Sequence, residues 1–229
     1  MPRSKPRGRA EPVLALYGHP FSSYTWKALI ALYANGTPFE FRMLDPDHPE
    51  HGAVVEAAGP LGQFPVLVEG ETTVFEASCI IEYLHLHHPG TAPLLPADPA
   101  AALDVRMLDR VFDLAVMSPM QEIVAEHIRS PGMPDPAIEG RARDKLDRAY
   151  RWLNAWLARV PRTGDAITLI ECAAAPSLFY ADWVYPIPMQ FDALRQWRAH
   201  LLSLPAVARC VDEARPYRHF FPLGAPNRD

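Results

Sequence analysis

The residues best suited to chemistry include two serines at the start of a helical pattern. Ser22 and Ser23 follow a short apolar run and a turn, and the pattern after them ends near Asn35. A helix N-terminus supplies free amides and the positive end of a dipole, which together favour a thiolate over a thiol. A serine hydroxyl that donates a hydrogen bond to sulfur favours the thiolate further. Ser22 or Ser23 could therefore activate a bound thiol, or could simply cap the helix.

A second candidate feature is a proline that opens an apolar segment, Gln63-Phe64-Pro65-Val66. If the bond before Pro65 were cis, the backbone of Val66 would face a ligand, and an extended peptide could pair with it as an added strand. The ordinary alternative is a trans proline at a strand edge. This segment is thus a possible peptide-binding edge.

A third feature is the sequence Glu76-Ala77-Ser78 at the start of another helical pattern. Free amides at a helix N-terminus bind carboxylates, while Glu76 could bind an ammonium group. Helix capping is again the plain alternative. Taken together, the three features describe a site for a short zwitterionic peptide that carries a thiol in its middle.

Strand and helix signals in the first part of the chain must position these residues. They predict the order β-α-β-β-β-α, in which the first two strands form a parallel pair and the next two form a hairpin. We assign no element between the second and third strands. The strands are expected at 13–17, 39–44, 64–68 and 72–75, and the helices at 22–35 and 78–87.

Beyond residue 88 the pattern changes. Residues 89–99 contain four prolines, which suits a stiff exposed linker. The remainder is predicted to be helical, and Thr168 with Glu171 fits a capping box at the start of an apolar helix. The helices are expected at 100–129, 136–160, 169–185, 192–203 and 206–214. We therefore predict a basic tail at 1–11, an α/β domain at 12–88, a linker at 89–99 and an all-helical domain at 100–222.

Composition limits the possible functions. The 229 residues carry a formal net charge of −5, and no extended basic surface is indicated, so we expect no nucleic-acid partner. We expect neither a secretion signal nor a membrane span, because no sufficiently long apolar run occurs, and this favours the cytoplasm. Three widely spaced cysteines indicate neither a disulfide framework nor a metal site.

The joint pattern resembles the soluble glutathione S-transferase superfamily from Val13 to about Pro222. The run from Ser22 to Lys27 is most similar to the zeta class of that superfamily. Four signposts carry the resemblance: Leu16-Tyr17 before the serine loop, residues 62–67, Glu76 with Ile80 and Tyr83-Leu84, and residues 168–171. The resemblance implies a thioredoxin-like N-terminal domain, glutathione as co-substrate without a metal, and a homodimer.

Carried over residue by residue, the resemblance assigns roles in glutathione binding. Ser22 is implied to supply the activating hydroxyl, and Ser23 is the second candidate for this role. The bond between Phe64 and Pro65 becomes cis, and the Val66 backbone pairs with the cysteinyl part. Gln63 lies near the glycine carboxylate and Glu76 binds the γ-glutamyl end. The sequence departs from the family at Ala77, where a serine is usual; Ser78 is rotated about 100° away on a helix, so affinity for glutathione is expected to be lower.

The second substrate is expected between the loop at 19–23 and the first long helix of the other domain. Core packing is the alternative role for each candidate. The candidates are His19, Met107, Arg110 and Met117, with Phe112, Phe220 and Phe221 as further possibilities.

The leading hypothesis is an enzyme whose glutathione thiolate attacks a small electrophile by conjugation, displacement or isomerisation, including isomerisation of a maleyl-type acid. The alternative is a non-catalytic binding or interaction module, for which Ala77 is the sequence argument. Thiol–disulfide exchange ranks lowest, because residues 19–27 contain no cysteine.

Overall fold

The computed structural model describes residues 13–229, so the predicted tail at 1–11 lies outside the described residues. The N-terminal half is built on a four-stranded sheet of order β2-β1-β3-β4. β1 runs parallel to β2 and antiparallel to β3, and β3 and β4 form a hairpin. The predicted parallel pair and hairpin are confirmed. The strands are β1 (Leu14–Gly18), β2 (Glu40–Met43), β3 (Val66–Glu69) and β4 (Thr72–Phe75).

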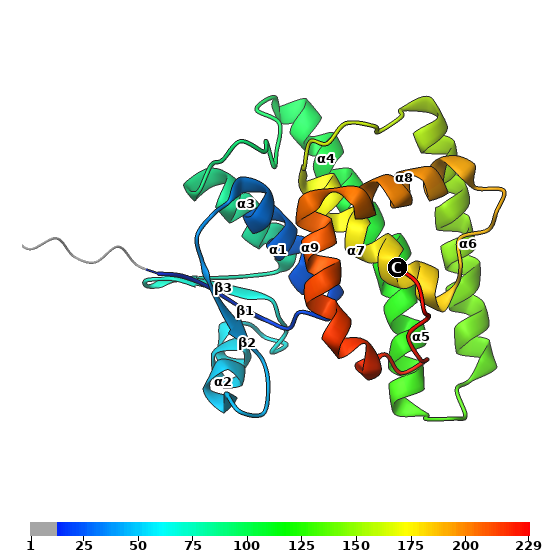
Figure 1. Cartoon of the computed structure of the whole chain (residues 1–229), viewed down its shortest axis with the longest axis horizontal. Helices are drawn as coiled ribbons and strands as arrows, with labels where there is room; N and C mark the ends of the chain where they lie inside the picture. The colour runs from blue at the N-terminus through cyan, green and yellow to red at the C-terminus, as the bar shows by residue number, and fades with distance from the viewer. Residues whose placement is uncertain (1–12) are drawn as a thin grey trace, which may run out of the picture.

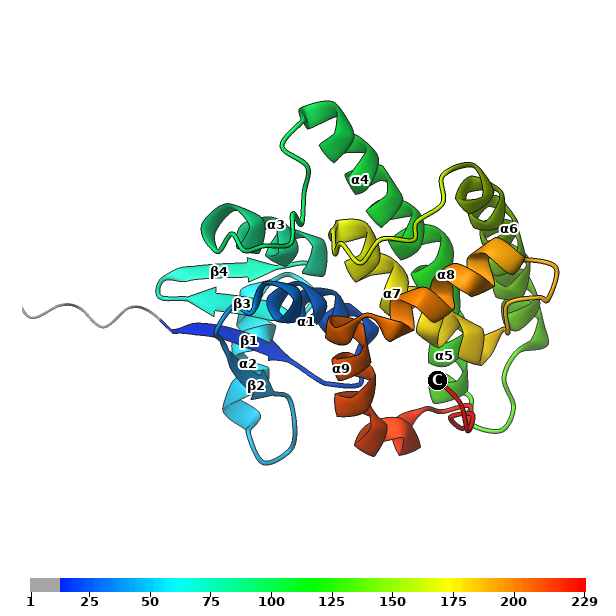
Figure 2. The same ribbon diagram turned by 45° about the horizontal axis from the view of Figure 1, so that its top comes forward.

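Three helices accompany this sheet, and two of them were predicted. α1 (Ser23–Asn35) and α3 (Ala77–His87) pack against each other beside the strands (Figures 1 and 2). α2 (Pro49–Ala58) was missed. Its first residue is a proline, which suits a helix start, but Val55 is its only buried residue. An apolar periodicity that weak does not reveal a helix.

The second half is helical throughout the described residues, as predicted. Its α-helices are α4 (Pro99–Val111), α5 (Ser118–Arg129), α6 (Pro136–Arg159), α7 (Leu169–Val184), α8 (Asp192–Ser203) and α9 (Pro205–Ala214). The single helix expected at 100–129 is interrupted by η1 (Phe112–Met117), a π-helical segment, and η2 (Arg215–Phe220) is a 3-10 helix after α9. No described helix combines the length and apolar character needed to span a membrane.

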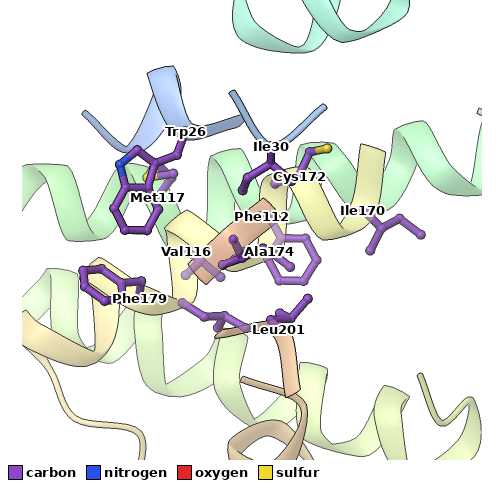
Figure 3. Close-up of a cluster of buried hydrophobic side chains, with 14 of the residues drawn as sticks. Trp26, Ile30, Phe112, Val116, Met117, Ile170, Cys172, Ala174, Phe179 and Leu201 are labelled. Carbon is purple, nitrogen blue, oxygen red and sulfur yellow. The ribbon is translucent and has the colours of Figure 1, made fainter. Parts of the chain in front are cut away.

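One hydrophobic core joins the two halves around α7. Every residue of α7 is buried, which is the behaviour of a helix that is apolar on all sides. Figure 3 shows Trp26 and Ile30 of α1 packed with Phe112 of η1 and Phe179 of α7. The first domain is therefore fixed to the second by shared core packing.

The start of α7 and the preceding proline-rich segment are tied together. Thr168 and Glu171 form the predicted capping box, in which Glu171 accepts a hydrogen bond from the Thr168 amide at 2.9 Å. The Leu169 amide donates to the Leu94 carbonyl at 2.8 Å. Leu94 and Leu95 are buried, so the segment expected to be an exposed linker contributes to the core.

Candidate active site

A cavity of about 770 Å³ lies where the N-termini of α1 and α3 face the junction of α4, η1 and α5. This volume is typical of a site for a small molecule. Elements from both halves of the chain form its walls. The lining residues are Ser22, Tyr24, Gly59, Pro60, Leu61, Gly62, Gln63, Phe64, Pro65, Phe75, Glu76, Ala77, Arg110, Asp113, Leu114, Ser118, Gln121, Glu122 and Ala125.

Ser22 is the N-cap of α1 and lines the cavity. Its Oγ accepts a hydrogen bond from the Thr25 amide at 3.2 Å, which leaves the hydroxyl hydrogen available to a ligand. The preceding loop is held by the Trp26 indole, which donates to the Pro20 carbonyl at 2.6 Å. The first turn of α1 contains no acidic residue, so the positive end of the helix dipole is not compensated there.

Ser23 lies in a different environment from Ser22. It is buried and does not line the cavity. Its Oγ accepts a hydrogen bond from the Gln121 side chain at 3.3 Å. Of the two candidate serines, only Ser22 faces the space in which a thiol could bind.

The segment before β3 forms one side of the cavity. The peptide bond between Phe64 and Pro65 is cis, as the family resemblance implied. Gln63, Phe64 and Pro65 all line the cavity. Val66 does not: it is fully buried inside the sheet, where it pairs with Tyr17 and Phe75. The structure therefore does not bring the Val66 backbone to the cavity surface.

Glu76 and Ala77, two of the residues predicted to bind glutathione, line the cavity at the N-terminus of α3. Glu76 is the N-cap of α3 and has a φ of 67°, a left-handed conformation that is uncommon for a residue other than glycine. Its side chain is exposed to the cavity and has no hydrogen bond or ion pair with any described residue. Ala77 lines the cavity at the first turn of α3, which contains no acidic residue. A free carboxylate thus lies beside free helix amides.

Ser78 points away from the cavity into a buried ionic cluster. Its hydroxyl accepts a hydrogen bond from Lys27 Nζ at 2.9 Å and donates to Asp109 at 2.8 Å. Lys27 is fully buried and lies 2.7 Å from both Asp109 and Asp113. Arg110 contacts the same two carboxylates, at 2.8 and 2.6 Å. This cluster of Lys27, Ser78, Asp109, Arg110 and Asp113 joins α1, α3, α4 and η1, and its members Arg110 and Asp113 line the cavity.

The cluster also sets the protonation of its members. Burial raises the pKa of the Asp113 carboxyl, although the charge of Lys27 acts in the opposite direction. Burial acts to lower the pKa of the Arg110 guanidinium, but its hydrogen bond to Asp109 and the charge of that carboxylate raise the pKa overall. Arg110 is therefore a permanent cation with two carboxylate partners.

Of the four residues predicted for the second substrate, only Arg110 lines the cavity. Met107 is exposed on the outer face of α4, and Met117 is fully buried in the core. His19 lies outside the cavity, where its ring packs edge-on against Tyr217 at 4.8 Å between centroids. Burial lowers the pKa of His19. The further candidates Phe112, Phe220 and Phe221 do not line the cavity either.

One part of the cavity wall, formed by α5 and Tyr24, was not predicted from the sequence. Ser118, Gln121, Glu122 and Ala125 line the cavity, and their spacing of three or four residues places them on one helix face. That spacing was visible in the sequence, but the π-helical segment that precedes α5 was not.

Tyr24 presents a phenol to the cavity, and its hydroxyl has no hydrogen-bond partner among the described residues. Burial, with the nearby charges of Asp113 and Glu76, raises the pKa of Tyr24 to about 12. The hydroxyl is therefore protonated at neutral pH and can donate a hydrogen bond.

Comparisons with known proteins agree with this geometry. A profile described as "Glutathione S-transferase, N-terminal domain" matches residues 16–92. Glutathione S-transferase 1 of Dianthus caryophyllus is 32% identical, over 88% of this chain and 96% of its own. The probable maleylacetoacetate isomerase of Vibrio cholerae is 25% identical, over 89% of this chain and 97% of its own.

A solved structure shows the same architecture. The glutathione S-transferase of Methylobacterium radiotolerans, in complex with glutathione sulfonate, superimposes with a TM-score of 0.71 and 27% identity. The match covers 86% of this chain and 94% of that chain. With a thioredoxin-like half, an all-helical half and a full-length relative at 32% identity, the chain belongs to the glutathione S-transferase family.

Proposed function

We propose that this protein activates the thiol of glutathione at Ser22 and transfers the resulting thiolate to a small electrophile bound against α4, η1 and α5. The observation that carries the proposal is the convergence of two helix N-termini on one cavity, with Ser22 at one and the Glu76 carboxylate at the other. Conjugation, displacement and addition followed by isomerisation all use this thiolate. Glutathione is the co-substrate, and the chemistry needs no metal.

The two helix ends would hold opposite parts of glutathione. Glu76 binds the ammonium of the γ-glutamyl residue, and the first amides of α3 bind its carboxylate. Gln63 donates to the glycine carboxylate at the far side. The cysteinyl sulfur then lies at the N-terminus of α1, within reach of the Ser22 hydroxyl. Free amides, the helix dipole and that hydroxyl all stabilise the thiolate.

The decisive experiment titrates bound glutathione. The ultraviolet absorbance of the thiolate is followed against pH for wild type, Ser22→Ala and Ser23→Ala, with affinity measured by calorimetry. In wild type the thiol should titrate well below its pKa in free solution. Loss of the Ser22 hydrogen bond should raise that pKa by about one to two units, the value of one hydrogen bond to a charged group.

Ser23→Ala is the matched control, because it removes a hydroxyl one residue away that does not line the cavity. It should leave the thiol pKa unchanged. Ser22→Thr, which keeps a hydroxyl and the N-cap, should retain most of the shift. If Ser23→Ala rather than Ser22→Ala abolishes the shift, the assignment of the activating serine is wrong. If wild type does not bind glutathione at millimolar concentration, the proposed function is wrong.

A second copy of the chain is the proposed partner besides the substrates. Leu86 of α3 and Leu103 and Met107 of α4 are 70%, 65% and 54% exposed. Leu103 and Met107 lie on one helix face because they are four residues apart. Beside these residues, Glu82 of α3 and Arg106 of α4 form a bidentate ion pair that joins the two helices. An exposed apolar face of this kind favours burial against a partner, and self-association would cover it.

The cytoplasm is the proposed location. Cys172 and Cys210 are free and buried and Cys79 is free and exposed, which suits a reducing compartment. Glutathione that serves as a thiol donor must also be reduced. Removal of reactive electrophiles, a detoxification role, is the physiological process that this chemistry would serve.

A further inference from the structure

The charged side chains around the cavity are mainly acidic. Within the described part of the chain, its lining includes three carboxylates, Glu76, Asp113 and Glu122, and one cation, Arg110. Whether the cavity can bind a negatively charged second substrate therefore depends on whether Arg110 is already neutralised and on how the three carboxylates are paired.

Arg110 is neutralised by its own neighbours. Its Nη2 lies 2.8 Å from Asp109 and 2.6 Å from Asp113, and it also donates to the Ser78 hydroxyl at 2.9 Å. Lys27, the other cation of the cluster, is fully buried against the same two carboxylates. Two cations and two anions sum to zero. A substrate carboxylate that approaches Arg110 consequently meets a cluster without net charge.

The other two carboxylates do not favour an anion either. Glu122 is paired with Lys145 of α6, whose Nζ lies 2.7 and 3.0 Å from the two carboxylate oxygens. Lys145 does not line the cavity. Glu76 has no partner in residues 13–229, and in the proposed function it binds the ammonium of glutathione. Neither Glu122 nor Glu76 therefore brings an unpaired cation into the cavity that could bind a second ligand.

Bound glutathione adds further negative charge. Its two carboxylates rest on uncharged donors, the amides of α3 and Gln63, so no protein cation offsets them. Activation at Ser22 then creates a thiolate in the same cavity. A carboxylate on the electrophile would approach that thiolate without a counter-charge, and like charges a few ångströms apart repel more strongly in a partly buried site than in water.

Much of the remaining cavity surface is apolar, and the polar side chains of α5 that line it, Ser118 and Gln121, carry no charge. Leu61, Leu114 and Phe75 are 73%, 67% and 41% exposed and line the cavity together with Phe64. Building on the proposed function, we infer that this protein discriminates against carboxylate-bearing electrophiles such as maleyl-type acids and accepts an uncharged electrophile in their place. Tyr24 supplies an uncharged donor for a carbonyl or nitro oxygen of that substrate.

The test compares two electrophiles that react at the same carbon, a chlorodinitrobenzoate and its methyl ester. In both, the glutathione sulfur forms a bond to the ring carbon, chloride leaves with the bonding electron pair, and the thiol proton passes to solvent. Each catalysed rate is divided by the rate of the uncatalysed reaction with glutathione. We expect an enhancement about tenfold greater for the ester. An equal or greater enhancement for the carboxylate overturns the inference.

A positive charge introduced into the cavity wall tests whether charge is the basis of the discrimination. Ala125 of α5 is exposed and lines the cavity. Ala125→Lys should raise the enhancement for the carboxylate relative to the ester about fivefold or more. Ala125→Met, of similar length but uncharged, should leave that ratio as in wild type. A ratio unaffected by lysine overturns the inference, because charge would then not be the basis of the discrimination.

Failure of the inference is distinguishable from failure of the proposed function. The thiolate absorbance of bound glutathione is recorded in the same samples. Absence of turnover with both electrophiles overturns the inference even if the thiolate signal is present. Absence of that signal as well overturns the proposed function.

Discussion

At the scale of single residues, the site differs from the family pattern at Ala77. The family usually has a serine after the glutamate, and the hydroxyl of Ser78 cannot replace it because it contacts Lys27 and Asp109. The γ-glutamyl carboxylate is therefore expected to bind through backbone amides alone. A site with one hydrogen-bond donor fewer should bind glutathione more weakly than its relatives do.

Restoring that hydroxyl should strengthen glutathione binding. We expect Ala77→Ser to lower the dissociation constant about tenfold or more, the effect of one added hydrogen bond to a charged group. Ala77→Val adds volume without a donor and should not increase the affinity. Calorimetric titration with glutathione measures both variants. An Ala77→Ser protein that binds no better than wild type would place the carboxylate out of reach of residue 77.

At the scale of secondary structure elements, the buried ionic cluster connects the site to the fold. Lys27 is buried on α1, between Ser78 of α3 and the two aspartates of α4 and η1. Its removal leaves Asp109 and Asp113 with Arg110 as their only remaining cationic partner in the cluster. Loss of one partner from a buried ion pair is strongly destabilising, because the charge left behind is no longer compensated.

Lys27→Met should lower the free energy of unfolding by about 3 to 5 kcal/mol at neutral pH. Burial already raises the pKa of Asp113, and Lys27 opposes that rise, so the variant should raise it further. An acid whose pKa is higher in the folded state gains stability as pH falls through that pKa. The deficit should therefore shrink as the pH is lowered from neutral, as measured by urea unfolding across pH.

A double variant provides the control for this cluster. Lys27→Met combined with Asp113→Asn removes one cation and one anion and should recover part of the lost stability. Equal deficits in the single and double variants would mean that lost packing of the lysine stem, rather than uncompensated charge, causes the effect. A deficit that is independent of pH would lead to the same conclusion.

The elements that could be predicted were those with strong local signals. The apolar strands, the capping box at Thr168 and the helix starts at Ser22 and Glu76 are all determined by neighbouring residues. α2 was missed because it buries only Val55. η1 was missed because a π-helical segment has no distinctive residue pattern. Of the two methionines predicted for the second substrate, Met117 is buried within η1 and Met107 lies exposed on α4 outside the cavity lining.

At the scale of the whole molecule, the two halves share one core, yet an apolar face remains exposed across them. Leu86 belongs to the first half, and Leu103 and Met107 belong to the second. The face spans α3 and α4 and lies apart from the cavity lining. A second copy that covered it would therefore bridge both halves of the chain without occupying the substrate site.

Negative charges introduced on this apolar face should prevent two copies of the chain from associating. We expect wild type to sediment as a dimer and Leu103→Glu with Met107→Glu to sediment as a monomer, because two carboxylates buried in an interface would lack counter-charges. Met133→Glu with Ile128→Glu introduces the same charges at other exposed apolar residues and should leave the dimer intact. Sedimentation velocity over a range of concentrations measures all three proteins. A monomeric wild type, or dissociation by the control pair alone, would contradict the proposed interface; a monomer that still titrates glutathione as a thiolate would show that each chain holds a complete thiol site.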